Sequence, residues 1–161
     1  MSDLETARLR LFELRGLPGG SVCPCCDQHV QEYRWSMYGS AVRGLFMMFH
    51  LQQSADDFVH INALKDLGYK GQGDGTRWKA WELAEEDPRR KEDGGRSGYW
   101  RLTDPGIAFL ANELEIWKYI WTYNNAVIKY SGPPYMTMQT VSVVEALGKN
   151  FHYGKMLAGE F

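Results

Sequence analysis

Apolar residues recur every three or four positions over residues 4–14, which is typical of a helix with one apolar face. Ser2, with Glu5 three positions later, forms a capping-box pattern at its start. Gly16 and Pro18 follow, and neither residue continues a helix readily. The pattern therefore predicts a first helix that ends before Gly16.

A second helical pattern begins near Ser36, after a glycine-rich turn and a cluster of cysteines. Its apolar positions share one face of a helix, and they are Met37, Ala41, Leu45, Met48 and Phe49. Methionine fills irregular gaps in protein cores, so its recurrence favours packing over a binding groove. We expect a core helix that starts near Ser36.

Shorter units follow from residue 58. FVHI at 58–61 is β-branched and aromatic, as in a short strand. Asn62 can cap the helix that comes next, and a glycine-rich connection spans 69–75. RWKAWELAEE at 77–86 has the spacing of an amphipathic helix of roughly ten residues.

A charged, glycine-rich segment at 85–98 has the composition of an exposed loop. It ends at YWRLT (99–103), whose alternating pattern predicts a strand. Another helix is predicted to begin at 104–106, because the proline of Asp-Pro-Gly is favoured in a first helical turn.

Residues 116–123 and 126–130 alternate as strands do, near the end of the chain. Asn124-Asn125 between them tolerates the positive φ angles of a tight turn, so we expect a β-hairpin. A further strand is predicted over 135–141. Ser142 can cap the helix after it, and a last short helix follows.

These elements predict an α+β fold with N-terminal helices, a central mixed unit, and a C-terminal hairpin plus short helices. We place the segment boundaries at 1–53, 54–115 and 116–161. A length of 161 residues suits one ordinary domain, so we expect the three segments to form one compact unit.

Composition narrows the classes of function. Eighteen basic and twenty acidic residues give a formal charge of −2, so binding to nucleic acid or an anionic membrane needs a local basic patch. The first residues lack the basic and apolar regions of a signal peptide. The longest apolar stretch, 41–51, contains Arg43 and is too short to span a membrane. We expect a cytoplasmic protein without a membrane partner.

All three cysteines lie in CPCCDQH at 23–29. In a reduced compartment such a cluster indicates metal binding or reactivity before disulfides. Cys23, Cys26 and His29 have the spacing of zinc ligands, and zinc needs four. Candidates for the fourth ligand are Cys25, Asp27, His50, His60 or a residue of a second subunit. The alternative is a proline-kinked turn with partly buried thiols and no metal.

The order of units from 58 to 110, which ends in SGYWRLTDPGIAFL, resembles a winged helix-turn-helix domain. The wing strand of that family commonly carries an aromatic residue, a leucine and a threonine, followed by a glycine and a helix with an aromatic residue. The matching positions are Trp100, Leu102, Thr103, Gly106 and Phe109. Over most of its length the chain also resembles uncharacterised small winged-helix-like proteins encoded by bacteriophages and prophages, which implies a fold but no activity.

The resemblance implies a non-enzymatic DNA-binding or regulatory protein, in which helix 77–86 enters the major groove of duplex DNA and loop 88–98 is the wing. The predicted contacts are Arg77, Lys79, Arg89, Arg90, Lys91 and Arg96. Residues 65–101 hold nine basic and eight acidic residues. Because phosphate binding rests on net positive charge, the prediction depends on which way the acids face.

A protein-interaction module without nucleic-acid binding is the alternative. Trp117, Tyr119, Trp121 and Tyr123 occupy alternate positions, so one strand face is aromatic. With the N-terminal helices, this face can bind a host protein or a second copy of the chain. Because the four histidines stand outside HExxH and CxxCH motifs, and no GxSxG motif occurs, an enzyme is not expected.

Overall fold

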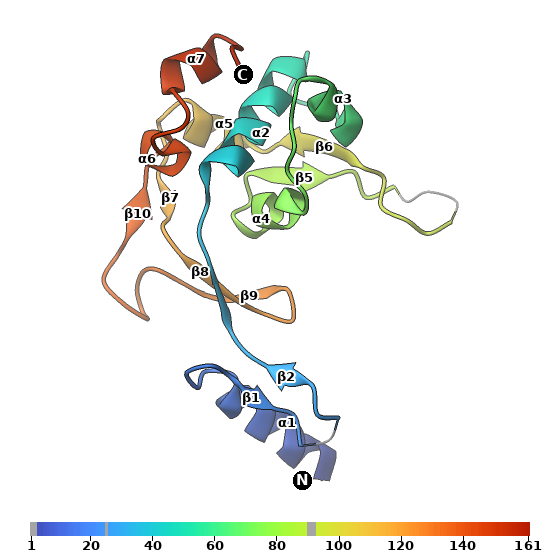
Figure 1. Ribbon diagram of the computed structural model, residues 1–161, viewed down its shortest axis with the longest axis vertical. Coiled ribbons are helices and arrows are strands. Elements are labelled where there is room, and N and C mark those ends of the chain that lie inside the picture. Colours follow the sequence, from blue (N-terminus) through green and yellow to red (C-terminus); the bar gives the residue numbers. More distant parts are fainter. Residues whose placement is uncertain (1–2, 25, 90–92) are drawn as a thin grey trace.

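The computed structural model describes residues 3–24, 26–89 and 93–161. Over these residues the chain folds into short helices and small antiparallel sheets, which confirms the predicted α+β class (Figure 1). The helices are α1 (Asp3–Leu14), α2 (Gly39–Leu51), α3 (Ile61–Asp66), α4 (Asp74–Ala80), α5 (Asp104–Leu110), α6 (Val143–Leu147) and α7 (Tyr153–Leu157). The strands are β1 (Ser21–Val22), β2 (His29–Val30), β3 (Tyr33–Trp35), β4 (Val59–His60), β5 (Ala84–Glu86), β6 (Tyr99–Leu102), β7 (Ile116–Trp117), β8 (Ile120–Tyr123), β9 (Ala126–Tyr130) and β10 (Thr140–Val141).

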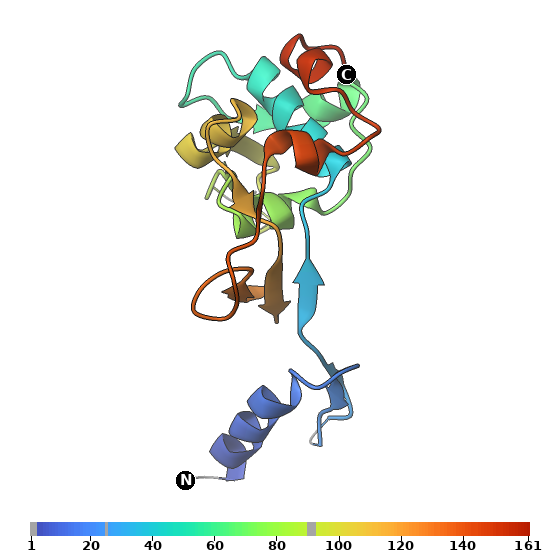
Figure 2. The same cartoon turned by 90° about the vertical axis from the view of Figure 1, so that its left-hand side faces the viewer.

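Helix α1 and the β1–β2 hairpin lie together at one end of the molecule (Figures 1 and 2). The first predicted helix is therefore confirmed, although Ser2 of its capping box lies outside the described residues. None of the residues of α1 is buried. Arg15 joins this end to the rest of the chain, because its Nε lies 3.1 Å from Glu32 Oε1 just before β3.

Helix α2 forms the centre of the core and packs against α3, α5, α6 and β6. Its buried residues are Ala41, Val42, Gly44, Leu45, Phe46, Met47 and Met48. A β-carbon at Gly44 would collide with the rings of Trp78 and Tyr69, so this position brings α2 close to α4. The predicted role of methionine as core filler is confirmed at Met37 and Met48, and Met47 is buried as well.

Strands β4, β6 and β5 form a sheet in that order, with β6 antiparallel to both neighbours. Trp100 and Leu102 of β6 are buried in the core, and the strands predicted over 58–61 and 99–103 are confirmed. Thr103 then caps α5, because its Oγ1 accepts a hydrogen bond from the Gly106 N–H at 3.1 Å.

A second three-stranded sheet has the order β3–β8–β9. Asn124 and Asn125 have φ angles of 50° and 61°, which confirms the predicted turn between β8 and β9. Ser142 and Glu145 form a complete capping box at the start of α6, and α7 is the predicted last helix. Trp81 Nε1 donates to the Trp117 carbonyl at 2.8 Å. This hydrogen bond links the core to β7, the strand that precedes β8.

The helix predicted over 77–86 is wrong in its second half. Helix α4 ends at Ala80, Glu82 has a positive φ of 58°, and strand β5 follows. Ala84 is buried opposite Leu102 of β6, so pairing with a distant strand outweighs the helical spacing of the segment.

Helix α2 starts at Gly39 and not near Ser36, because strand β3 pairs with β8 up to Trp35 and the backbone is still extended at Tyr38. Phe49, expected on the buried face, is exposed. The predicted cap of α3 is also wrong, since His60 Nδ1 accepts a hydrogen bond from the Asn62 N–H at 3.1 Å.

Two predictions near the C terminus need correction. The single strand expected over 116–123 is divided into β7 and β8, because the N–H of Tyr119 donates to the Ser131 hydroxyl instead of to a strand. The strand expected over 135–141 is confined to β10, which pairs with β7. Within the described ranges, no helix combines the length and the apolar character that a membrane crossing requires.

Candidate nucleic-acid interface

Helix α4 is anchored through Trp78, which is fully buried. Its indole Nε1 donates to the Ala41 carbonyl of α2 at 3.0 Å, and its ring meets Trp100 of β6 edge-on at 5.6 Å. A buried indole with its N–H satisfied is a strong packing anchor. The face of α4 opposite Trp78 is therefore held outward.

Asp74 opens α4 and is 2 % exposed. The hydroxyls of Tyr38 and Tyr69 both donate to its carboxylate, the second at 2.5 Å. Burial, followed by the hydrogen bond to Asp74, raises the pKa of Tyr38 to about 12, and the same causes raise the pKa of Tyr69. Asp74 thus fixes the first turn of α4 from a buried position.

Arg77 is turned toward the segment that enters α2. Its Nε donates to the Ser36 carbonyl at 3.2 Å, and its guanidinium lies over the rings of Trp35 and Tyr38 at 5.2 and 4.7 Å. These contacts occupy the faces and one edge of the guanidinium. Arg77 therefore positions α4 in this structure.

Lys79 and Arg89 are two predicted contacts that are exposed on either side of β5. The Lys79 side chain is 54 % exposed, and its Nζ lies 4.0 Å from Glu86. The Arg89 side chain is 84 % exposed, although its guanidinium binds Asp87 at 2.6 Å. The hydrogen bond from Arg89 lowers the pKa of the Asp87 carboxyl.

Arg96 is exposed and lines a groove of about 320 Å³ between α3, the start of α4 and β6. Lys65 of α3 and Thr76 of α4 line the same groove. The structure thus brings Arg96 near the first turns of α4, as the prediction requires. Arg90 and Lys91 lie outside the described residues.

Several acids of this region face inward. Asp74 and Asp87 are buried, and Glu86 is half-buried beside Lys79. Glu85 points to the other side of the sheet, where its carboxylate lies 2.5 Å from Arg101 Nε. In the described part of this region the exposed basic side chains are Lys65, Lys70, Lys79, Arg89 and Arg96, and the exposed acids are Asp66, Glu82, Glu85 and Asp93. Because Glu85 pairs with Arg101 on the other side of the sheet, the exposed cations outnumber the exposed acids that remain.

No family model, curated protein or solved structure matches the chain. Function must therefore be argued from the geometry of its own residues. Two parts of that geometry could not be seen in the sequence. The burial of Asp74 and the proximity of Lys65 to Arg96 both depend on long-range packing.

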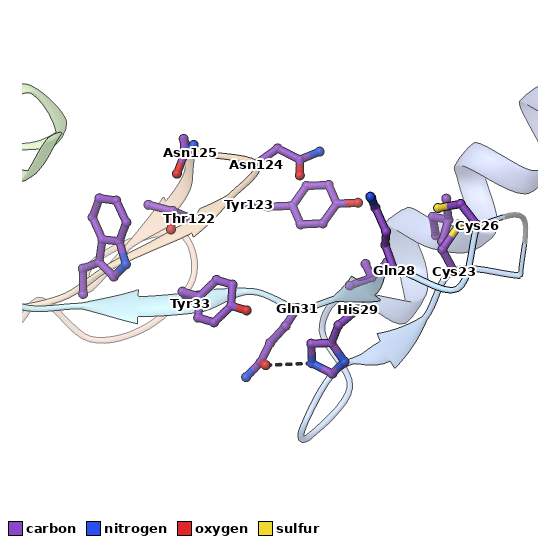
Figure 3. A pocket seen from close by; sticks show the side chains of 13 residues that line it. Cys23, Cys26, Gln28, His29, Gln31, Tyr33, Thr122, Tyr123, Asn124 and Asn125 are labelled. Atoms are coloured by element: carbon purple, nitrogen blue, oxygen red, sulfur yellow. Dashed lines mark hydrogen bonds between the residues drawn. The ribbon is translucent and has the colours of Figure 1, made fainter. Parts of the chain in front are cut away.

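The cysteine hairpin is a separate candidate site. Cys23 is buried and Cys26 is exposed, and both line a cavity of about 410 Å³ next to the β8–β9 turn (Figure 3). His29 lines it too, but its Nε2 makes a 3.0 Å hydrogen bond with Gln31 Oε1 (Figure 3). The part of the chain that the structure describes holds no group of three ligands able to bind a metal, and Cys25 is not in that part. Among its described residues the hairpin offers two thiols and the Nδ1 atom of His29, fewer than the four ligands that zinc needs.

Proposed function

We propose that the chain is a non-enzymatic DNA-binding protein of winged-helix type. The observation that carries the proposal is topological: the chain runs α2, β4, α3, α4, β5, loop, β6, and its sheet has the order β4–β6–β5. In a winged helix the hairpin that holds the wing also joins the strand that follows the first helix. On this assignment α4 is the recognition helix and the loop between β5 and β6 is the wing.

The distribution of charge supports the same surface. Lys79, Arg89 and Arg96 are exposed around α4 and the loop, while Asp74 and Asp87 are buried. Exposed cations release counterions when they contact phosphates, which supplies most of the affinity for duplex DNA. Lys65 adds a further cation at the groove edge.

Two matched double variants test the proposal. Lys79→Ala with Arg96→Ala removes cations from the surface, whereas Lys149→Ala with Lys155→Ala removes two exposed cations near the C terminus. We expect the first pair to weaken binding to a mixed-sequence duplex and to reduce its salt slope by about 2. Equal affinity of the two double variants, with both folded, would contradict the proposed surface.

A protein-interaction module is the second candidate, and α1 favours it. Leu4, Leu9 and Phe12 are 60 %, 55 % and 55 % exposed on a helix without a buried residue. Exposed apolar side chains on one element mark contact surfaces. A second copy of the chain is the simplest partner, and Phe12→Asp should then lower the mass measured by light scattering. A monomeric wild-type protein at high concentration would remove this candidate.

A further inference from the structure

One face of the β3–β8–β9 sheet combines aromatic rings with cations. Arg34, Trp121 and Lys129 are directly paired across the three strands and therefore share a face. The next row, Trp35, Ile120 and Tyr130, lies on the opposite face. Ile120 is buried and lines a cavity against Trp81 of the core. The row with Trp121 therefore faces away from the core.

Tyr119 and Tyr123 extend this face along the chain, because each lies two residues from Trp121. All three rings are half-buried, so each keeps part of its surface exposed. Cations lie close to every ring: Arg34 Cζ is 4.4 Å and Lys118 Nζ 5.5 Å from the Tyr119 centroid, Lys129 Nζ is 5.0 Å from Trp121, and Arg15 Cζ is 5.9 Å from Tyr123.

Cations outnumber carboxylates among the described ion pairs of this face. Glu32 pairs with two of the cations, because it lies 3.1 Å from both Arg15 Nε and Lys129 Nζ, and only 13 % of its side chain is exposed. Arg34 and Lys118 are exposed on the surface. A row of rings that is flanked by surplus cations matches a ligand with flat groups and regularly spaced negative charges.

We propose that the face formed by Arg34, Lys118, Tyr119, Trp121 and Lys129 binds single-stranded nucleic acid. Unstacked bases lie on Trp121 and Tyr119, and the cations contact the phosphates between them. A duplex presents its bases edge-on and cannot stack on these rings. A protein interface of this size is depleted of lysine at its centre, whereas lysines flank both rings here. The proposal does not rest on duplex binding by α4, because the two surfaces lie on different sheets.

Fluorescence anisotropy with labelled oligothymidylate and oligouridylate tests the proposal. We expect binding by the full chain that Trp121→Ala weakens about tenfold and Trp121→Phe largely preserves, since stacking needs a ring and not the indole N–H. Tyr135→Ala removes an exposed tyrosine outside the face and should have no effect. The DNA and RNA probes show whether the 2′-hydroxyl contributes.

Circular dichroism establishes that each variant is folded. If Trp121→Ala does not fold, Arg34→Ala replaces it, because Arg34 is exposed and its loss should lower the salt slope by about 1. Loss of duplex affinity in the Lys79 and Arg96 variant, with single-strand affinity retained, separates this site from α4. Absence of single-strand binding by the wild-type chain, or equal affinity of folded Trp121→Ala and Tyr135→Ala, would overturn the proposal.

Discussion

The hydroxyl of Tyr69, in the loop after α3, donates to Asp74 in the first turn of α4 at 2.5 Å. Tyr38, just before α2, donates to the other carboxylate oxygen. Tyr38, which lies 36 residues before Asp74, therefore meets the connection between α3 and α4 at one buried carboxylate. Because a buried charge needs its hydrogen-bond donors, this contact fixes α4 relative to α2 and α3.

Replacement of Tyr69 by phenylalanine should destabilise the fold. The variant leaves Asp74 buried with one fewer donor, and such a loss costs about 1–3 kcal/mol of the free energy of unfolding. Urea denaturation measures the change. Tyr135→Phe, at an exposed tyrosine, is the matched control and should lie within about 0.5 kcal/mol of wild type. Identical midpoints for all three proteins would show that the contact contributes nothing.

Alkaline pH should lower the free energy of unfolding, because the hydroxyl of Tyr38 loses its proton. Its pKa is raised from 10.0 to about 12 in the folded state, so folding favours the protonated hydroxyl. That contribution is complete below pH 10 and is lost as the pH rises through about 12. We expect the free energy of unfolding to fall above pH 10 in wild type and to fall less steeply in Tyr38→Phe. Parallel stability curves for the two proteins would contradict this assignment.

Low pH should destabilise the fold by protonating Asp87 and so breaking its ion pair with Arg89. Because Arg89 lowers the pKa of Asp87 below 3.8 in the folded state, the contribution of this pair is present above the unfolded pKa and is lost as the pH falls through the folded value. Carboxyl chemical shifts measured by NMR should show Asp87 titrating below 3.8. In Arg89→Ala, the titration should return toward the ordinary value, and an unmoved titration would show that the pair does not form in solution.

If the β1–β2 hairpin binds zinc, the zinc content of the protein should depend on Cys23 and Cys26. Cys23, Cys26 and His29 line one cavity, and the hydrogen bond between His29 and Gln31 engages Nε2 and leaves Nδ1 for a metal. We propose that zinc content falls in Cys23→Ser, in Cys26→Ser and in His29→Ala. Metal analysis of protein purified without chelator measures this. Metal-free wild-type protein would leave the hairpin as a turn, and unchanged zinc content in His29→Ala would remove His29 as a ligand.

Elements whose ends or turns are decided by neighbouring residues could be predicted from the sequence. Ser142 and Glu145 cap α6, Pro105 stands in the first turn of α5, and Asn124-Asn125 turns the hairpin, as expected. In each case the residues that decide the structure are neighbours in the chain, so a short pattern contains the whole cause.

The elements that depend on distant partners could not be predicted. Ala84 pairs with Leu102, eighteen positions later in the chain, and this pairing converts the end of a helical pattern into β5. Arg77 had the position of a DNA contact, but Trp35 and Tyr38 lie close enough in space to hold it. Hence the basic candidates were visible in sequence, whereas their orientation and the burial of Asp74 and Asp87 required the fold.

The salt dependence of duplex binding tests the central claim most directly. Lys65, Lys79, Arg89 and Arg96 are exposed around α4 and the loop, and each phosphate they neutralise releases counterions. A plot of log Kd against log salt concentration should therefore show a slope of about 3.6 for the wild-type protein and about 1.8 for the Lys79→Ala, Arg96→Ala variant, at about 0.9 for each phosphate contact. Absence of duplex binding at low salt by the folded wild-type protein, or the same slope for both proteins, would contradict the account.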